Sequence, residues 1–108
     1  MKPRLQFFNA GPEIMKQVLA LNEAVEKSGL ERSLLHLVKL RASQINGCSY
    51  CVDMHTREAR QDGESEQRVY LVSAWRESPL YSDRERAALA WTETLTALAG
   101  HHVEDADY

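Results

Sequence analysis

Two cysteines and one histidine within eight residues are the part of this sequence best suited to chemistry. Cys48 and Cys51 form a Cys-x-x-Cys pair, and His55 follows four residues after the second cysteine. On a helix these three side chains share a narrow face, because each residue turns the helix by about 100°. Unpaired backbone N–H groups at a helix start favour a thiolate, and the second sulfur can close a disulfide with the first. The spacing therefore indicates reversible thiol redox chemistry.

Either cysteine has a claim to be the attacking thiolate. Cys48 lies nearer the helix start, where the macrodipole helps most. Cys51 has His55 one turn later, placed to accept its proton, and we therefore favour Cys51 as the attacker. With a peroxide, Cys51 would become a sulfenic acid, and Cys48 would condense with it to give a disulfide that an external dithiol reduces. Asp53 and Glu58 flank this face and could orient His55, but solvated surface positions are the default interpretation of both.

Other interpretations of the cysteine pair stay open. Two cysteines on a helix can simply be small apolar residues in a structural role. The pair and His55 also offer three zinc ligands, to which one of three further histidines could be added: His36, His101 and His102. Zinc sites of this kind, however, normally draw their second ligand pair from a separate knuckle or helix. A thioredoxin-type motif is disfavoured, because it follows a strand and no strand pattern precedes Cys48.

Five helices joined by short loops are predicted from the apolar spacing and the capping residues. The first helix covers about residues 12–28, and the second begins at 31–33 and ends at Asn46-Gly47. The third runs from Cys48 or Ser49 to Gln61, the fourth from about Ser65 to Arg76, and the fifth from Ser82 to Gly100. Gly47 separates two of these helices, since glycine can take the left-handed conformation that ends a helix. The last helix begins with Ser82-Asp83-Arg84-Glu85, which has capping-box spacing.

No segment alternates between apolar and polar residues as a strand does, and Leu5–Phe8 is expected to be at most an extended arm. A sixth element could begin near His101, although the sequence shows no signal for one. The fold class is therefore all-α, with five or more short helices and the cysteine pair at the N-terminus of the third helix.

Composition indicates one soluble globular domain over residues 1–108, since 44% of the residues are hydrophobic and 27% are charged. Residues 55–108 hold six basic and eleven acidic side chains, which argues against nucleic acid as a partner. No apolar run approaches the ~18 residues that a membrane span needs, and the N-terminus has too few apolar residues for a signal peptide. We expect a cytoplasmic protein with no membrane partner, in a reducing compartment that does not favour structural disulfides.

The run from Leu37 to Thr56, LVKLRASQINGCSYCVDMHT, resembles the alkyl hydroperoxidase D-like branch of the carboxymuconolactone decarboxylase superfamily. The resemblance continues through Gly63, Trp75 and the stretch RERAALAWTETLT at 84–96, and so covers about residues 11–98. It implies an all-helical fold and a homo-oligomer, commonly a trimer or a hexamer. It also implies that the protein reduces alkyl hydroperoxides and is recycled by a dithiol reductant such as a lipoylated protein. No cofactor is expected.

The resemblance also implies roles for single residues. The family's second cysteine forms the sulfenic acid and its first cysteine resolves it, roles that fall on Cys51 and Cys48, and the family's relay histidine falls on His55. A glutamate of the family stands twelve residues before the first cysteine, where this chain has His36. A neutral imidazole cannot supply the charge of a carboxylate, but it can still accept a proton, and we keep His36 as a candidate catalytic residue. Relatives continue past the position of Tyr108 with another helical segment, so we expect a domain that lacks it.

The leading hypothesis is thus a peroxidase-like thiol oxidoreductase. A thiol–disulfide exchanger or redox sensor that uses the same cysteines is the alternative, because the replacement of the glutamate by His36 would harm it less. A structural or zinc-binding helical oligomer is a further alternative from another class.

Overall fold

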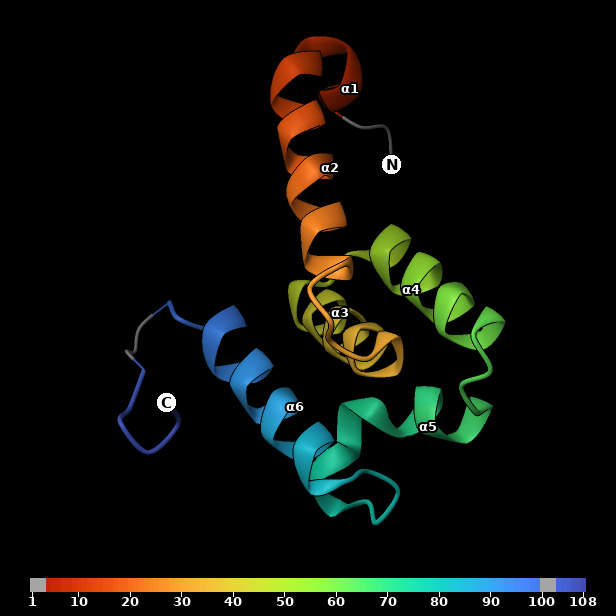
Figure 1. Cartoon of the computed structure of the whole chain (residues 1–108). Coiled ribbons are helices and arrows are strands. Elements are labelled where there is room, and N and C mark those ends of the chain that lie inside the picture. Colours follow the sequence, from red (N-terminus) through yellow and green to blue (C-terminus); the bar gives the residue numbers. More distant parts are fainter. Residues whose placement is uncertain (1–3, 100–102) are drawn as a thin grey trace. The chain divides into compact units, whose positions relative to one another are not determined.

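The computed structural model describes residues 4–99 and 103–108, and helices make up most of it (Figure 1). The described residues form six α-helices and one 3₁₀-helix: α1 (Phe7–Ala10), α2 (Pro12–Glu26), α3 (Arg32–Asn46), α4 (Ser49–Gln61), α5 (Glu66–Leu71), the 3₁₀-helix η1 (Val72–Glu77) and α6 (Asp83–Thr96). No strand occurs among them, and the predicted all-α class is confirmed. The chain divides into two compact units, residues 1–30 and residues 31–108.

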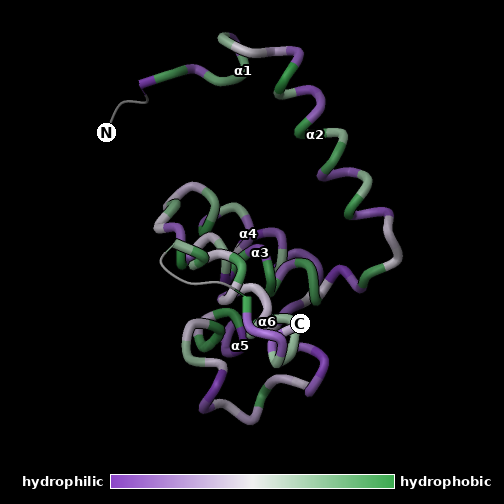
Figure 2. Tube along the Cα trace, turned by 90° about the vertical axis from the view of Figure 1, so that its left-hand side faces the viewer, coloured by the Kyte–Doolittle hydropathy of each residue, from purple (hydrophilic) through white to green (hydrophobic). Residues whose placement is uncertain are grey.

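The first unit contains α1 and α2. The expectation of an extended arm over Leu5–Phe8 is wrong, because Phe7 and Phe8 begin α1. Local hydrogen bonding decides this, since the N–H of Ala10 donates to the carbonyl of Gln6 at 2.8 Å. Helix α2 begins at Pro12 as predicted, and none of its residues is buried. Figure 2 shows hydrophobic positions recurring along α2 between hydrophilic ones, the pattern of an amphipathic helix.

The second unit is built around α3, which packs against α4 and α6 (Figure 1). Its most deeply buried large side chains come from three elements: Leu37 and Leu40 of α3, Val72 of η1 and Leu89 of α6. Burying one such side chain stabilises a fold by roughly 1.5–3 kcal/mol. Helix α3 is therefore the central support on which the start of α4 rests.

Gly47 reverses the chain between α3 and α4, as predicted. It has φ +68° and ψ +26°, in the left-handed region that favours glycine, and it is the C-cap of α3. Its N–H donates to the carbonyl of Gln44, and the N–H of Cys48 donates to the carbonyl of Ser43, both at 3.1 Å. This tight ending places Cys48 directly at the start of the next helix.

The segment predicted as one helix over about residues 65–76 consists of two. Helix α5 ends at Leu71, and η1 follows with a non-helical residue, Ala74, inside it. The tighter winding of η1 accompanies the burial of Trp75, whose indole N–H donates to Glu93 of α6 at 2.8 Å. The prediction of one regular helix is therefore wrong, because a contact distant in the sequence competes with local helical spacing. Trp75 therefore packs in the core of the second unit.

The capping box at the start of α6 is present as predicted: the Ser82 hydroxyl accepts from the N–H of Glu85, and the Glu85 carboxylate accepts from the N–H of Ser82. Helix α6 ends at Thr96, four residues before the predicted end at Gly100. Gly100, His101 and His102 lie outside the described residues, and so does the start of the sixth element considered there. In the part of the chain that the structure describes, no helix combines the length and apolarity needed to cross a membrane.

Candidate functional site

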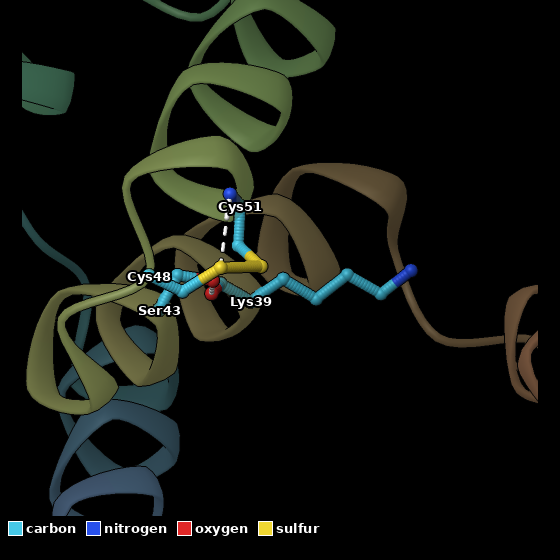
Figure 3. Close-up of a disulfide and its surroundings, with 4 residues drawn as sticks. All are labelled: Lys39, Ser43, Cys48 and Cys51. Carbon is cyan, nitrogen blue, oxygen red and sulfur yellow. Dashed lines mark hydrogen bonds between the residues drawn. A yellow bond between two sulfur atoms is a disulfide. The ribbon is translucent and has the colours of Figure 1, made fainter. Parts of the chain in front are cut away.

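Cys48 and Cys51 form a disulfide at the start of α4 (Figure 3). Their Cα atoms are 5.3 Å apart, within the usual range for a disulfide. Cys48 is the N-cap of α4, and its Sγ accepts a hydrogen bond from the backbone N–H of Cys51 at 3.3 Å. The helix start at Ser49 agrees with the prediction. The backbone therefore holds the two sulfurs close together and offers an N–H donor to Cys48.

Helix α3 lies beneath this disulfide and supplies Ser43 and Lys39 to its surroundings (Figure 3). Ser43 is buried, and its hydroxyl donates to the carbonyl of Lys39 at 2.7 Å. The side chain of Lys39 extends away from the sulfurs, so that its amine lies at the far end (Figure 3). On the other side both cysteines are only half-buried, and Tyr50 between them is 76% exposed. One edge of the cysteine pair is thus open to a reagent.

His55 lies one turn after Cys51 on α4, and its side chain is 15% exposed. Its Nδ1 is 3.2 Å from Oε2 of Glu58. Asp53, the other carboxylate considered for this role, instead accepts a hydrogen bond from Arg57 at 3.0 Å. When Glu58 is ionised it can only accept, so Nδ1 carries the proton in this contact and Nε2 is left as an acceptor. Among the described residues His55 has no hydrogen bond to either cysteine, and its relay role stays a prediction.

His36 occupies the first half of α3 and is paired with a carboxylate from the end of α4. Its side chain is 9% exposed, and its Nε2 is 2.6 Å from Oδ2 of Asp62. Arg32, one turn earlier on α3, donates to the same oxygen from Nε at 2.8 Å. The hydrogen bond from His36, followed by that from Arg32, holds the pKa of Asp62 below its ordinary value. Asp62 therefore faces His36 as a carboxylate at neutral pH.

The structure places the disulfide at the end of the α3–α4 pair near Gly47. His55 stands eight residues after Gly47 on α4, and His36 stands eleven residues before it on α3. At 1.5 Å per residue these separations from the turn are about 12 Å and about 16.5 Å along the helices. No three His, Cys, Asp or Glu side chains among residues 4–99 and 103–108 are arranged to hold a metal ion together. His101 and His102, considered as zinc ligands, lie outside the described residues.

The model of the carboxymuconolactone decarboxylase family matches residues 12–94, which include both cysteines, His55 and His36. The chain belongs to this family. Two relatives are uncharacterised: YdfG of Bacillus subtilis is 40% identical over 108 residues, covering all of this chain and 74% of the relative. YnjA of Escherichia coli is 35% identical over 71 residues, covering 66% of this chain and 39% of the relative.

One solved structure is similar to this chain in both sequence and fold. ATU0492 of Agrobacterium tumefaciens, a protein of unknown function whose description also refers to the antioxidant defence protein AhpD, shares 50% sequence identity with this chain. The two structures align with a TM-score of 0.92 over 98% of this chain and 73% of ATU0492. The predicted AhpD-like branch of the family and the AhpD-like fold are both confirmed by this likeness.

Reasoning from the sequence of this family member missed Asp62 and Arg32 as partners of His36. Asp62 is the residue that directly follows the predicted helix ending at Gln61. If two helices joined at Gly47 run antiparallel, position 62, 15 residues from the turn, lies about one helical turn farther from it than position 36, 11 residues away. The antiparallel pairing was the available signal, but it carries no information on which side chains face each other. The neighbouring contact between His55 and Glu58 was among the possibilities, because the two residues are three positions apart on one helix.

Proposed function

We propose that this family member reduces alkyl hydroperoxides, with Cys51 as the attacking thiolate and Cys48 as the resolving thiol. The observation that carries the proposal is the cysteine pair itself, which lies within disulfide distance at the start of α4 with one edge open. A helix start favours the ionised form of both thiols. The description of ATU0492, which refers to AhpD, supports an antioxidant role.

The cycle transfers two electrons and starts from the reduced pair. The Cys51 thiolate attacks the terminal oxygen of the hydroperoxide, the O–O bond breaks, and the departing alkoxide takes a proton that His55 supplies. The resulting sulfenic acid condenses with Cys48 to form the disulfide and water. An external dithiol, such as the lipoyl group of a lipoylated protein, then returns two electrons and two protons. We place this cycle in the cytoplasm, where dithiol reductants keep such pairs reduced.

The test is dithiol-dependent consumption of cumene hydroperoxide with dihydrolipoamide as the reductant. Wild-type protein should turn over, and Cys51→Ser should not, because no sulfenic acid can form. Ser49→Ala is the matched control, since it changes an exposed hydroxyl between the two cysteines without removing a sulfur. Turnover that survives Cys51→Ser would show that the attacker is assigned wrongly. Turnover that survives removal of both cysteines would eliminate the proposal.

His36 stays a candidate proton acceptor in this cycle, because it occupies the position of the family glutamate. His36→Glu restores a carboxylate there and should raise the rate of peroxide consumption. The new carboxylate would lie beside the carboxylate of Asp62, and the two like charges could disturb the fold. The folding of the variant is therefore verified by far-ultraviolet circular dichroism before the rate is measured. An unchanged rate in folded protein would remove His36 from the cycle.

A second candidate function, thiol–disulfide exchange, is favoured by the hydrogen bond from the Cys51 N–H to the Cys48 sulfur. In the reduced protein this donor stabilises a thiolate on Cys48 rather than on Cys51. The Cys48 thiolate would attack a substrate disulfide and release one thiolate, and Cys51 would then displace the second and close the pair. Oxidised glutathione is the probe. Reduction of this probe that is lost in Cys48→Ser, with no peroxide turnover in the wild-type protein, would select exchange over peroxide reduction.

We also propose that the chain forms a homo-oligomer through α2. Four of its large apolar side chains are at least half exposed: Ile14, Val18, Leu19 and Leu21. A patch of this kind is typical of a protein interface. Because the family resemblance implies a homo-oligomer, we propose that a second copy of this chain covers the patch. Size-exclusion chromatography with light scattering tests the proposal, and a monomer at micromolar concentration would contradict it.

A further inference from the structure

Tyr50 lies between the two cysteines in the first turn of α4, within the unit formed by residues 31–108. It is 76% exposed, and in the described part of the chain no hydrogen bond, ion pair or ring contact holds its phenol ring. Tyr81, by contrast, is buried, and its hydroxyl donates to the carbonyl of Arg68 at 2.5 Å. Single exposed aromatic residues are common on protein surfaces, so exposure alone assigns no role to Tyr50. Its neighbours on the helix do.

Helical geometry makes Met54 a neighbour of both Tyr50 and Cys51. Met54 is half-buried and follows Tyr50 by four residues and Cys51 by three, and side chains at these spacings are adjacent on a helix. At about 100° per residue, Met54 and Tyr50 are turned from Cys51 by about 60° and about 100° in one sense, whereas His55 is turned by about 40° in the other. Tyr50 and Met54 therefore form an apolar strip that borders Cys51 on the side away from His55.

The Tyr50–Met54 strip lies on the outer side of α4. The opposite side of this helix faces the core, where Ala59 is buried and Val52 packs against the core cluster. Beyond Tyr50 the strip is bordered by Asp53 and Arg57, which pair with each other at 3.0 Å. Because these two charges compensate each other, this border offers no net charge to a bound molecule. The strip is thus suited to an uncharged organic group.

We propose that the Tyr50–Met54 strip binds the organic group of the hydroperoxide and gives Cys51 a preference for bulky, uncharged hydroperoxides over hydrogen peroxide. This inference rests on the proposed peroxide reduction and adds the residues that select its substrate. The organic group lies against the ring of Tyr50 and the thioether of Met54, and the peroxide oxygens lie at Cys51, between the strip and His55. Hydrogen peroxide has no organic group and gains nothing from the strip.

The chemistry of the two side chains sets how selective the strip can be. A tyrosine offers a large contact area at a low cost in conformational entropy, because only two side-chain angles become fixed. Methionine is flexible and polarisable, so it adapts to organic groups of different shapes. An exposed strip of this kind distinguishes substrates by their apolar area rather than by a precise outline. The contact of one aromatic group with the Tyr50 ring should improve binding by up to about tenfold.

The experiment measures kcat/KM for cumene hydroperoxide and for hydrogen peroxide, with dihydrolipoamide as the reductant, and compares the ratio of the two values. Tyr50→Ala should lower this ratio by about tenfold, through a higher KM for cumene hydroperoxide. Tyr50→Phe keeps the ring and should keep the ratio. The matched control is Tyr70→Ala, the same change at a tyrosine of α5 that is 68% exposed, and it should also keep the ratio. Equal ratios for Tyr50→Ala and Tyr70→Ala would overturn the proposal, and a Tyr50 that only docks the reductant would give this result.

A second measurement separates a failure of this inference from a failure of the proposed thiol chemistry. Cumyl alcohol carries the organic group of cumene hydroperoxide but has no peroxide bond. Saturation-transfer NMR detects its contact with the oxidised protein, the state in which the structure shows Tyr50 exposed. The transfer signal should fall severalfold in Tyr50→Ala and persist in Tyr70→Ala. This result without any peroxide turnover would support the strip as a binding surface and contradict the peroxide chemistry, whereas equal signals from the two variants would overturn the inference.

Discussion

Replacing Glu85 with glutamine should weaken the unit of residues 31–108 at the start of α6. The two carboxylate oxygens of Glu85 accept hydrogen bonds from the guanidinium of Arg68, and one of them also accepts from the N–H of Ser82 at 2.8 Å. Arg68 in turn donates to the carbonyl of Leu80 at 2.6 Å. Glutamine keeps the size of the side chain and the oxygen that serves the capping box. The substitution therefore isolates the charge of the pair.

The magnitude follows from the burial of the two partners. The side chain of Glu85 is 15% exposed and that of Arg68 is 22% exposed, so the pair lies between the surface and the core. Exposed ion pairs contribute about 0–1 kcal/mol, and hydrogen bonds to charged groups contribute about 1.5–3 kcal/mol. With partial screening by solvent, we expect Glu85→Gln to lower the free energy of unfolding by about 1–2 kcal/mol at neutral pH.

The loss should depend on pH in a defined direction. The hydrogen bond from Arg68 holds the pKa of Glu85 below its ordinary value of 4.5, against the opposing effect of burial. A carboxyl whose pKa is lower in the folded state stabilises the fold above its unfolded pKa, and that stability is lost as the pH falls through the folded pKa. The difference between wild-type protein and Glu85→Gln should therefore be complete at neutral pH and shrink below about pH 4.5.

Urea unfolding followed by tryptophan fluorescence, at neutral pH and at about pH 3.5, measures both effects. Glu77→Gln is the matched control, because Glu77 is exposed and has no hydrogen bond or ion pair in the described part of the chain. The control should change the free energy of unfolding by less than about 0.5 kcal/mol. If Glu85→Gln is as stable as this control at neutral pH, or if its deficit does not shrink in acid, the charged pair with Arg68 is not the source of stability.

Further predictions concern the redox pair, the core, the turn and the interface. In Cys48→Ser a sulfenic acid on Cys51 should persist after peroxide treatment and react with dimedone, as detected by mass spectrometry; a protein that stays unlabelled would contradict attack by Cys51. Leu37→Ala should lower the free energy of unfolding by about 2–5 kcal/mol in urea, because this side chain is fully buried, and a loss below about 1 kcal/mol would contradict its place in the core. Gly47→Ala should cost about 1–2 kcal/mol, because φ is +68° there while no atom lies close enough to clash, and unchanged stability would refute the backbone argument. Leu21→Lys should shift light scattering toward a smaller assembly, and an unchanged mass would place the interface elsewhere.

Most helix boundaries could be predicted because their signals are local. Pro12 at the first turn of α2, Gly47 at the end of α3 and Ser82 with Glu85 at the start of α6 act through their own backbone or through residues a few positions away. The same holds for the disulfide, since Cys48 and Cys51 lie within one turn of a helix start. Local chemistry of this kind is unchanged by the rest of the fold.

The errors arise where a distant contact or a weak local preference decides. Local hydrogen bonds turn Phe7 and Phe8 into a short helix, although their apolar pattern favours no particular structure. The irregular winding of η1 accompanies the bond between Trp75 and Glu93, which are 18 positions apart. Neither the short helix at Phe7 and Phe8 nor the irregular winding of η1 produces a periodic pattern of apolar residues in the sequence.

The sequence by itself determined the helices, the turn at Gly47 and the redox pair at a helix start, because these depend on propensities and spacings within a few residues. Only the tertiary structure decided that His36 faces Asp62, 26 positions away, and that a cavity opens beside them. Helical periodicity tells which residues share a face of one helix, but not which face of another helix they meet. The packing of α3 against α4 determines which faces meet. This packing orients His36 as a base, whereas the sequence marked it only as the residue that stands in place of the family glutamate.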